Sequence, residues 1–584
     1  MAKIYPIGVQ NFATLREDGY TYVDKTGFIE KLIKSGKYFF LSRPRRFGKS
    51  LLLSTIEAFY LGRKDLFDGL AISHADHDWQ PHPVLHIALN ACEYNDSESL
   101  LEKFGYEFSR WEKLYGNEMA SAPHAERFRF IIEQAYAHTG RKVVILIDEY
   151  DKPLLDSVYN KELQDTYRSQ LKAIYGNLKN CDRYIEFAML TGVSRFGKLS
   201  IFSDLNNLND ISLSDEYSAI CGMTAGEITA NFSEGIREFA DKNSISVEET
   251  YAKFKENYDG YHFSPSSPDM YNPFSVLCAL DDSRIGAYWF STGTPTFLID
   301  MIRRMEIDLR DLEHMQADIN DLMDASYDLS STLPIMYQSG YLTIKSYDGR
   351  FDTVALGYPN REVERGFLNG LMKIFTNSNS GRSEFDVSRF VLDVEAGRVD
   401  DFMSRLQALF SGYHYDQMDL GHLELHYRNV IYLVMKLMGF YTHAEMQTAS
   451  GRIDLVVETP DFLYLFEFKV NQNAQKAIEQ INGRDYLMPF QADGRKIIKV
   501  GANFDDSIRS ISAWLVEMEG LKTFLSLLSF CLFVSSSRQR RLEKSLTFYK
   551  WLFHTRYTMP PAGRGNIDSR RPSRPSGIWP SVVP

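Results

Sequence analysis

The sequence predicts an α/β protein of several domains, with a parallel sheet near the N-terminus, a largely helical middle and a mixed α/β domain near the C-terminus. Three observations predict this class. Apolar β-branched runs alternate with helical spacing over residues 38 to 190, helical spacing dominates from 215 to 330, and residues 422 to 504 follow the order αβββαβ. A chain of 584 residues, 44% of them hydrophobic, is long enough for several packed cores.

The first predicted strand covers residues 38 to 42 (YFFLS), and an apolar helix starts near residue 50. The loop between them ends in Gly-Lys-Ser, and this order of strand, loop and helix is what a phosphate-binding loop needs. Backbone N–H groups of the loop would cradle phosphates, Lys49 would reach the β- and γ-phosphates, and the Ser50 hydroxyl would ligate Mg²⁺. The loop residues are Arg43, Pro44, Arg45, Arg46, Phe47, Gly48, Lys49 and Ser50.

Arg43 stands where the usual phosphate-loop pattern has its first glycine. That glycine allows positive φ and a close approach of the backbone. Its absence predicts a reshaped loop or a weakened site. By itself, a Gly-Lys-Ser sequence is weak evidence for a phosphate-binding loop.

A second predicted strand, KVVILIDE at 142 to 149, supplies the partner motif. It is an apolar β-branched run typical of a central parallel strand, and it ends in two acids. Asp148 would hold Mg²⁺ through water, and Glu149 would orient or deprotonate the attacking water. The alternative is a buried strand that merely stops at charged loop residues. Together the two motifs predict ATP and Mg²⁺ as cofactors.

A third predicted strand, YIEFAML at 184 to 190, leads to Thr191. A polar residue at the tip of a strand beside the acidic one can sense the γ-phosphate, so Thr191 is a sensor candidate. Arg195 could supply a cation to the transition state. A surface arginine in a loop is an equally good interpretation of Arg195.

The C-terminal signal is a predicted hairpin over residues 452 to 469 (RIDLVVETPDFLYLFEFK), with Thr-Pro-Asp as its turn. Glu467 and Lys469 are two apart on one strand and therefore share a face, and the hairpin brings Asp454 close to them. Two carboxylates can hold a hard cation, and a lysine can position water or offset negative charge. The alternative is a solvated edge strand, but the charges interrupt an apolar run, where buried charge is costly unless paired or metal-bound.

The elements around this hairpin complete a recognisable order. A helix is predicted over 422 to 438, another over 473 to 487 with apolar positions at Ala477, Ile478, Ile481 and Tyr486, and a strand over 496 to 504. With GRID at 451 to 454 and EFK at 467 to 469, the segment resembles the PD-(D/E)XK nuclease superfamily, which has a restriction-endonuclease-like fold. The resemblance implies metal ligation by Asp454 and Glu467, catalysis with Lys469 and an accessory role for Gln480. It also suggests Glu424 as a further acid, with Glu445 as its rival.

Residues 4 to 515 as a whole resemble the bacterial AAA-ATPase-like family. The resemblance rests on YPIGVQNFATLREDGYTYVDKTGFIEKLI, FLSRPRRFGKSLLLSTIEAFYLG, ILIDEYDKPL, YDGYHF, YNPFSVL and TGTPTFLI. It implies an N-terminal P-loop domain of the additional-strand (ASCE, AAA-like) class, and members commonly carry a PD-(D/E)XK domain at the C-terminus. In that family RPRRFGKS is the ordinary form of the loop, so Arg43 is a family trait.

We place domain boundaries at 1–214 for the P-loop domain, 215–330 for a helical lid or winged-helix-like module, 331–420 for a mixed connector, 421–517 for the nuclease-like domain and 518–584 for an atypical tail. Strands are expected in the connector near 341 to 346 and 353 to 356. The tail starts with an apolar run too short to span a membrane, and continues with a Ser-, Arg- and Pro-rich composition that suggests disorder. A membrane anchor stays open, but an extension foreign to the family, for example from a shifted reading frame, is favoured.

The net charge of −12 argues against a uniformly basic nucleic-acid binder. Residues 535 to 584 carry ten Lys or Arg and two acids, which leaves −20 for residues 1 to 534. Any contact with nucleic acid in the body of the chain must be local. Basic residues around the hairpin could supply it, although solvated lysines are common on any surface; they are Arg428, Lys436, Lys469, Lys476, Arg484, Arg495, Lys496 and Lys499.

Five scattered cysteines without metal-site spacing favour free thiols, and the N-terminus lacks the features of a signal peptide. A cytoplasmic enzyme is therefore expected: an ATPase fused to a Mg²⁺-dependent nuclease acting on nucleic acid, with DNA as the expected class. Nucleotide state would gate cleavage through the middle module. The alternatives are a nucleotide-dependent switch or scaffold that binds nucleic acid without cutting it, and a nuclease with a vestigial ATPase domain. A homo-oligomer stays open.

Overall fold

A computed structural model describes residues 4–74, 76–195, 207–291, 309, 315–322, 332–375, 387–411, 423–439, 441–448, 451–483, 490 and 494–518. The chain divides into two compact units, Met1–Glu517 and Met518–Pro584. Apart from Met518, the second unit lies outside the described residues, so the predictions for the tail do too. The proposed domain boundaries within the first unit remain predictions.

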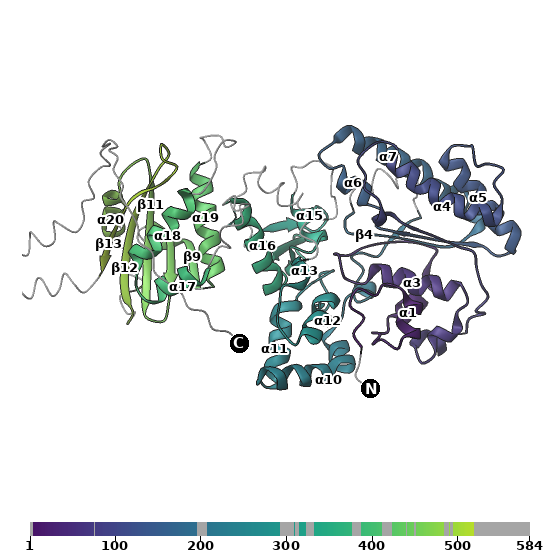
Figure 1. Cartoon of the computed structure of the whole chain (residues 1–584), viewed down its shortest axis with the longest axis horizontal. Coiled ribbons are helices and arrows are strands. Elements are labelled where there is room, and N and C mark those ends of the chain that lie inside the picture. The colour runs from purple at the N-terminus through teal and green to yellow at the C-terminus, as the bar shows by residue number, and fades with distance from the viewer. Residues whose placement is uncertain are drawn as a thin grey trace, which may run out of the picture. The chain divides into compact units, whose positions relative to one another are not determined.

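The N-terminal domain is built on a five-stranded parallel sheet in the order β2-β3-β4-β1-β5; β4 is labelled in Figure 1. Strands β1 and β3 are fully buried and β4 is buried except at Glu186, because both faces of the sheet are covered, as their largely apolar sequences predict. The three predicted strands are confirmed, the third with Thr191 inside it. The strands are β1 (Tyr38–Ser42), β2 (Val84–Ala88), β3 (Val143–Asp148), β4 (Ile185–Gly192) and β5 (Asn209–Asp210).

Helices cover both faces of this sheet. Alternate residues of β1 face opposite cores: Phe39 and Leu41 pack with α3 (Lys49–Tyr60), and Tyr38 and Phe40 pack with the helices of the other face. Those helices are α4 (Ser99–Tyr115), α5 (His124–Thr139) and α7 (Lys161–Tyr175), and they lie on the side of the sheet opposite to α1 (Phe12–Glu17) and α3 in Figure 1. Two further helices are α2 (Thr26–Ser35) and α6 (Lys152–Asp156).

The middle of the chain is helical up to residue 291 and then carries a small antiparallel sheet, β6-β8-β7. The expected connector strands are confirmed as β7 (Thr343–Asp348) and β8 (Thr353–Gly357). The helix before this hairpin, α15 (Thr332–Gln338), is mostly buried. The other elements are α10 (Ala225–Asn243), α11 (Val247–Tyr258), α12 (Pro273–Asp282), α13 (Tyr288–Ser291), β6 (Gln316–Asp318), α16 (Arg361–Phe375), α17 (Val387–Glu395) and α18 (Val399–Ser411).

The C-terminal domain has a five-stranded mixed sheet in the order β13-β12-β11-β10-β9. Strands β9, β10 and β11 are antiparallel neighbours, and β11 and β12 are parallel because α20 connects them. The predicted order αβββαβ is confirmed, and β13 adds an edge strand. The elements are α19 (Leu423–Met438), β9 (Tyr441–Thr448), β10 (Gly451–Glu458), β11 (Phe462–Val470), α20 (Ala474–Gly483), β12 (Lys496–Asp505) and β13 (Ser510–Met518).

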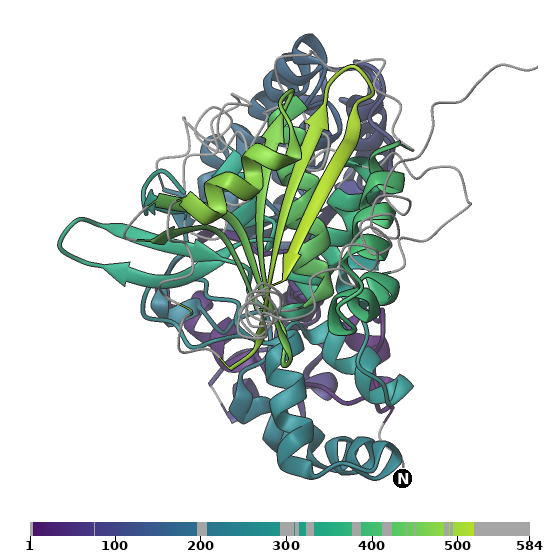
Figure 2. The ribbon, with the colours of Figure 1, turned by 90° about the vertical axis from the view of Figure 1, so that its left-hand side faces the viewer.

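The two faces of this sheet have different partners. Helix α20 lies across one face, where Ala477, Ile478 and Ile481 are buried, as their helical spacing predicts (Figure 2). Tyr486 lies outside the described residues. Helices α17, α18 and α19 cover the other face (Figure 1). No helix within the described ranges is both long and apolar enough to cross a membrane.

Candidate functional site

The phosphate loop joins β1 to α3, and Gly48 at its end has a φ of 93°. Arg46 has a φ of 65°, so a non-glycine residue also occupies the left-handed region inside the loop. The Lys49 side chain is buried, and its ammonium donates to the carbonyl oxygens of Arg43 at 2.9 Å and Pro44 at 3.1 Å. Burial lowers the pKa of Lys49, and the nearby carboxylates of Asp148 and Glu149 oppose that effect.

The structure brings three predicted side chains together at the carboxyl ends of β3 and β4. The Ser50 hydroxyl donates to Asp148 Oδ2 at 2.6 Å, and the Thr191 hydroxyl donates to Asp148 Oδ1 at 2.6 Å. Asp148 and Thr191 meet because β3 and β4 are parallel neighbours whose ends lie at the same edge of the sheet. Carboxylate and hydroxyl oxygens are the donors that Mg²⁺ prefers, so this set fits Mg²⁺.

Glu149 follows Asp148 with a φ of 53° and lines the cavity beside the loop. Burial raises the pKa of the Glu149 carboxyl, while the charge of Lys49 opposes the shift. A carboxylate with a raised pKa next to a phosphate loop is suited to accept a proton from water.

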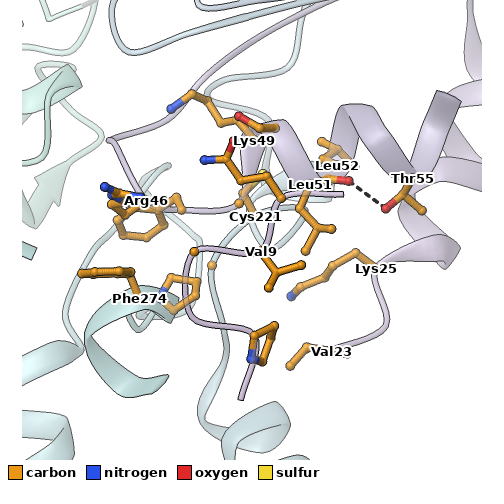
Figure 3. Close-up of a pocket in the computed structure, with 18 of the residues that line it drawn as sticks. Val9, Val23, Lys25, Arg46, Lys49, Leu51, Leu52, Thr55, Cys221 and Phe274 are labelled. Atoms are coloured by element: carbon orange, nitrogen blue, oxygen red, sulfur yellow. Dashed lines mark hydrogen bonds between the residues drawn. The ribbon is translucent and has the colours of Figure 1, made fainter. Parts of the chain in front are cut away.

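A cavity of about 520 Å³ opens beside the loop, and its size suits a nucleotide. Loop residues 45 to 50 line one part of it. The N-terminal segment contributes Val9, Val23 and Lys25, and α12 contributes Phe274, as Figure 3 shows. The cavity therefore combines charged groups at the loop with apolar groups beyond it.

Arg43 and Arg195, both predicted to belong to the nucleotide site, do not line this cavity. The Arg43 guanidinium is buried and donates to the carbonyls of Ser212 at 2.7 Å and Tyr217 at 3.3 Å. Arg195 forms an ion pair with Asp210. Among the described residues, neither arginine lines the cavity, and Pro44 does not line it either.

In the C-terminal domain, Asp454, Glu467, Lys469 and Gln480 come together on the face of the sheet that α20 covers. Asp454 lies in β10 next to the paired stretch Leu455–Glu458, and its Oδ2 accepts the Phe468 N–H at 2.8 Å. The Lys469 ammonium donates to Glu467 Oε1 at 2.9 Å and to Gln480 Oε1 at 2.8 Å. The Gln480 amide in turn donates to Glu467 Oε1.

Glu467 is 1% exposed, and its Oε2 has no hydrogen-bond partner within the described part of the chain. Burial, followed by the charge of Asp454, raises the pKa of Glu467 to about 7, although Lys469 opposes this. Two facing carboxylates and a buried oxygen that lacks a partner fit a divalent cation. No group of three or more His, Cys, Asp or Glu side chains in the described ranges could hold a metal ion. Glu424 lies in α19 and Glu445 in β9, but their side chains lie outside the described residues.

Comparisons with known proteins agree with this arrangement. Residues 6–202 match the family model described as "Predicted AAA-ATPase", and residues 422–514 match the PD-(D/E)XK nuclease superfamily. A protein of Azotobacter chroococcum mcd 1, described as "Uncharacterized protein in vnfD 5'region", is 35% identical over 533 residues, which are 89% of this chain and 99% of that protein. This chain belongs to the AAA-ATPase-like family. Its C-terminal domain belongs to the PD-(D/E)XK nuclease superfamily.

The AAA-ATPase-like domain contains two residues near the site that the sequence interpretation missed. The buried Asp151 carboxylate accepts the N–H of Ser194 at 2.7 Å and its hydroxyl at 2.8 Å, and so holds the segment after β4. Lys25 lines the cavity and pairs with Glu227 of α10 at 2.6 Å. Asp151 lies only two residues after Glu149, and this position could have marked it as a site residue. Lys25 and Glu227 are far apart in the sequence, and no spacing indicates that they pair.

The basic residues expected around the nuclease-like site do not form one free surface. Lys499 is buried and donates to Asn482 at 2.9 Å, and Arg495 pairs with Glu458 at 2.7 Å. Arg428 and Lys436 belong to α19, on the face of the sheet opposite to α20. Lys476 and Lys496 are exposed, and Arg484 lies outside the described residues. Only part of the predicted cluster can therefore meet a nucleic acid at this site.

Proposed function

We propose that this AAA-ATPase-like protein binds and hydrolyses ATP with Mg²⁺, and that its C-terminal domain is a metal-dependent nuclease whose activity depends on the nucleotide state. The observation that carries the nuclease half is the buried Glu467 carboxylate, which has one oxygen without a described partner and whose pKa is raised, after burial, by the charge of Asp454. Nucleic acid, with DNA as the expected class, is the substrate that a PD-(D/E)XK site suggests.

In the N-terminal pocket, the loop N–H groups and Lys49 would bind phosphates. Lys49 would exchange its two loop carbonyls for phosphate oxygens, which are stronger acceptors for an ammonium. Ser50 and Asp148 would hold Mg²⁺, Thr191 would orient Asp148, and Glu149 would accept the proton of the attacking water. Bound Mg²⁺ would neutralise the charge that develops on the phosphate oxygens.

In the C-terminal site, Asp454 and Glu467 would hold the divalent cation, which when bound polarises the phosphodiester and acidifies a water. Lys469 would position that water or stabilise negative charge, and Gln480 would hold Lys469 and Glu467 in place through its amide. Asp454 is already oriented by the backbone N–H of Phe468.

Helix α16 supports the proposal that the two activities are linked. It packs against α11 and α13 of the middle module and also against α19, the first helix of the nuclease-like domain. A change in the middle module would therefore reach α19 through direct packing.

One observation favours the alternative of a scaffold that binds nucleic acid without cutting it. The described residues supply two carboxylates to the C-terminal site, fewer than a full set of metal ligands, and Lys469 is engaged by Glu467 and Gln480. Nucleic-acid binding that persists without any cutting would support this alternative.

The deciding experiment incubates wild type, Asp454→Ala and Lys49→Ala with mixed DNA and RNA, with Mg²⁺ or Mn²⁺, and with or without ATP. We expect cutting by the wild type, none by Asp454→Ala, and cutting that no longer responds to ATP in Lys49→Ala. Absence of cutting by the wild type under every condition would reject the nuclease. Full cutting by Lys49→Ala, with an unchanged response to ATP, would reject the gating.

A further inference from the structure

The phosphate loop holds a left-handed residue where its sequence offers no glycine. Arg46 has a φ of 65°, a conformation that long L side chains rarely adopt and that costs energy. Gly48, the other residue of the loop with a positive φ, has no such cost. Neighbouring groups must therefore hold Arg46 in its conformation.

The carbonyl groups on both sides of Arg46 are bound by residues of the middle module. The indole N–H of Trp289 donates to the Arg45 carbonyl at 2.9 Å, and the Gly222 N–H donates to the Phe47 carbonyl at 3.0 Å. The first bond fixes the peptide group that precedes Arg46, and the second fixes the peptide group between Phe47 and Gly48. The Arg46 guanidinium also lies 4.9 Å from the centre of the Phe274 ring.

Trp289 is itself held firmly. It is 4% exposed, its backbone N–H donates to Glu362 Oε1 at 2.6 Å, and its ring lies 5.3 Å from that of Tyr341. Glu362 belongs to α16, which packs against α19 of the nuclease-like domain. Trp289 thus connects the phosphate loop to α16.

We infer that Trp289 is a positioning residue for nucleotide binding, which holds Arg46 in its left-handed conformation so that the loop N–H groups face the cavity. This inference rests on the proposed function of the loop as a nucleotide site. Because linkage is reciprocal, a nucleotide that needs this loop conformation also favours the docked position of Trp289.

The first test measures the dissociation constant of MgATP by calorimetry for wild type and Trp289→Phe. Loss of one neutral hydrogen bond should weaken binding about threefold to tenfold. The matched control is Trp514→Phe, which removes an indole N–H that donates to Asp400 at 2.9 Å in the C-terminal domain. We expect the control to bind MgATP as wild type does.

The second test asks whether Trp289 acts through the backbone of Arg46. Arg46→Ala and Arg46→Gly both remove the guanidinium, but only glycine removes the cost of the left-handed conformation. The weakening caused by Trp289→Phe should persist with alanine at position 46 and shrink with glycine. A purely structural role of Trp289 would give the same weakening in both backgrounds.

If Trp289→Phe melts at a lower temperature than wild type, a variant with benzothienylalanine at position 289 is tested in its place. Benzothienylalanine keeps the shape of the indole ring system but lacks its N–H. Equal weakening in the alanine and glycine backgrounds, or MgATP binding unchanged by either replacement, would overturn the inference. Wild type that binds no MgATP would instead overturn the proposed function of the loop.

Discussion

The Lys49 ammonium sits inside the phosphate loop with two carbonyl oxygens as hydrogen-bond acceptors. A buried cation is costly when its partners are neutral, and burial accordingly lowers the pKa of Lys49. We therefore do not expect Lys49 to stabilise the fold in the absence of nucleotide.

We predict that Lys49→Met weakens MgATP binding by about tenfold to a hundredfold, the effect of losing charge-assisted hydrogen bonds. Without nucleotide, the melting temperature should stay the same or rise, because a buried charge has been removed. Thermal melts with and without MgATP measure both effects. A large loss of stability without nucleotide would show instead that Lys49 supports the fold.

Glu467 should make cation binding depend on pH. Its pKa is raised from the usual 4.5 to about 7, so the folded state holds the proton more tightly than the unfolded state. Without metal, this group therefore lowers stability as pH rises from about 4.5 to about 7, with no further loss above that.

A cation at Glu467 must displace this proton. We predict that Mn²⁺ affinity rises by about tenfold per pH unit below pH 7 and levels off above it. Calorimetric titrations between pH 5.5 and 8.5 measure this, and Glu467→Gln should abolish the dependence. Affinity that is flat below pH 7 would show that Glu467 does not hold the ion.

The sequence predicts single elements well where local signals agree. Strands β1 and β3 are unbroken apolar runs, and α20 has helical spacing, so each falls where predicted. The order of strands in the sheets and the contacts of Arg43 with Ser212 and Tyr217 could not be predicted, because they join distant parts of the chain. The grouping of Asp454, Glu467 and Lys469 was predictable because Glu467 and Lys469 share one face of a strand and the hairpin turn brings the strand of Asp454 beside them.

Close packing of α20 on β12 positions Gln480. A Cβ at Gly501 would lie 2.7 Å from the Ala474 carbonyl oxygen and 2.9 Å from the Ile478 backbone N. We predict that Gly501→Ala pushes α20 away, lowers the free energy of unfolding by about 1 to 3 kcal/mol and weakens Mn²⁺ binding. Chemical denaturation and calorimetry measure the two effects.

Gly483→Ala in α20 is the matched control, because a Cβ at Gly483 meets no atom of the described residues within 4 Å. Alanine favours helix, so this variant should be neutral or slightly more stable. If Gly501→Ala behaved like Gly483→Ala, the packing of α20 on β12 would not set the position of Gln480.

At the scale of the whole molecule, charge is divided unevenly along the chain. Residues 535 to 584 carry ten Lys or Arg and two acids in a protein whose net charge is −12. Nonspecific binding to nucleic acid depends on such positive charge and falls as salt rises.

We predict that a chain ending at Met518 keeps the melting temperature and ATP affinity of the full protein, because residues 1 to 517 form a compact unit. In a filter-binding assay at low salt, the shortened chain should retain less DNA than the full protein. Its DNA binding should also fall less steeply as the salt concentration rises. Unfolding of the shortened chain would show instead that residues after Met518 stabilise the fold.

The hydrogen bonds that residues of later segments make with the phosphate loop have a consequence for biosynthesis. Residues 43 to 50 leave the ribosome early, but their partners Ser212, Gly222 and Trp289 are translated much later. At about 5 to 20 residues per second, the nascent loop waits roughly ten seconds or more for Trp289. We expect a chain still under synthesis to be unable to capture ATP until Trp289 has emerged. The proposed nucleotide site would therefore be complete before the nuclease-like domain is made.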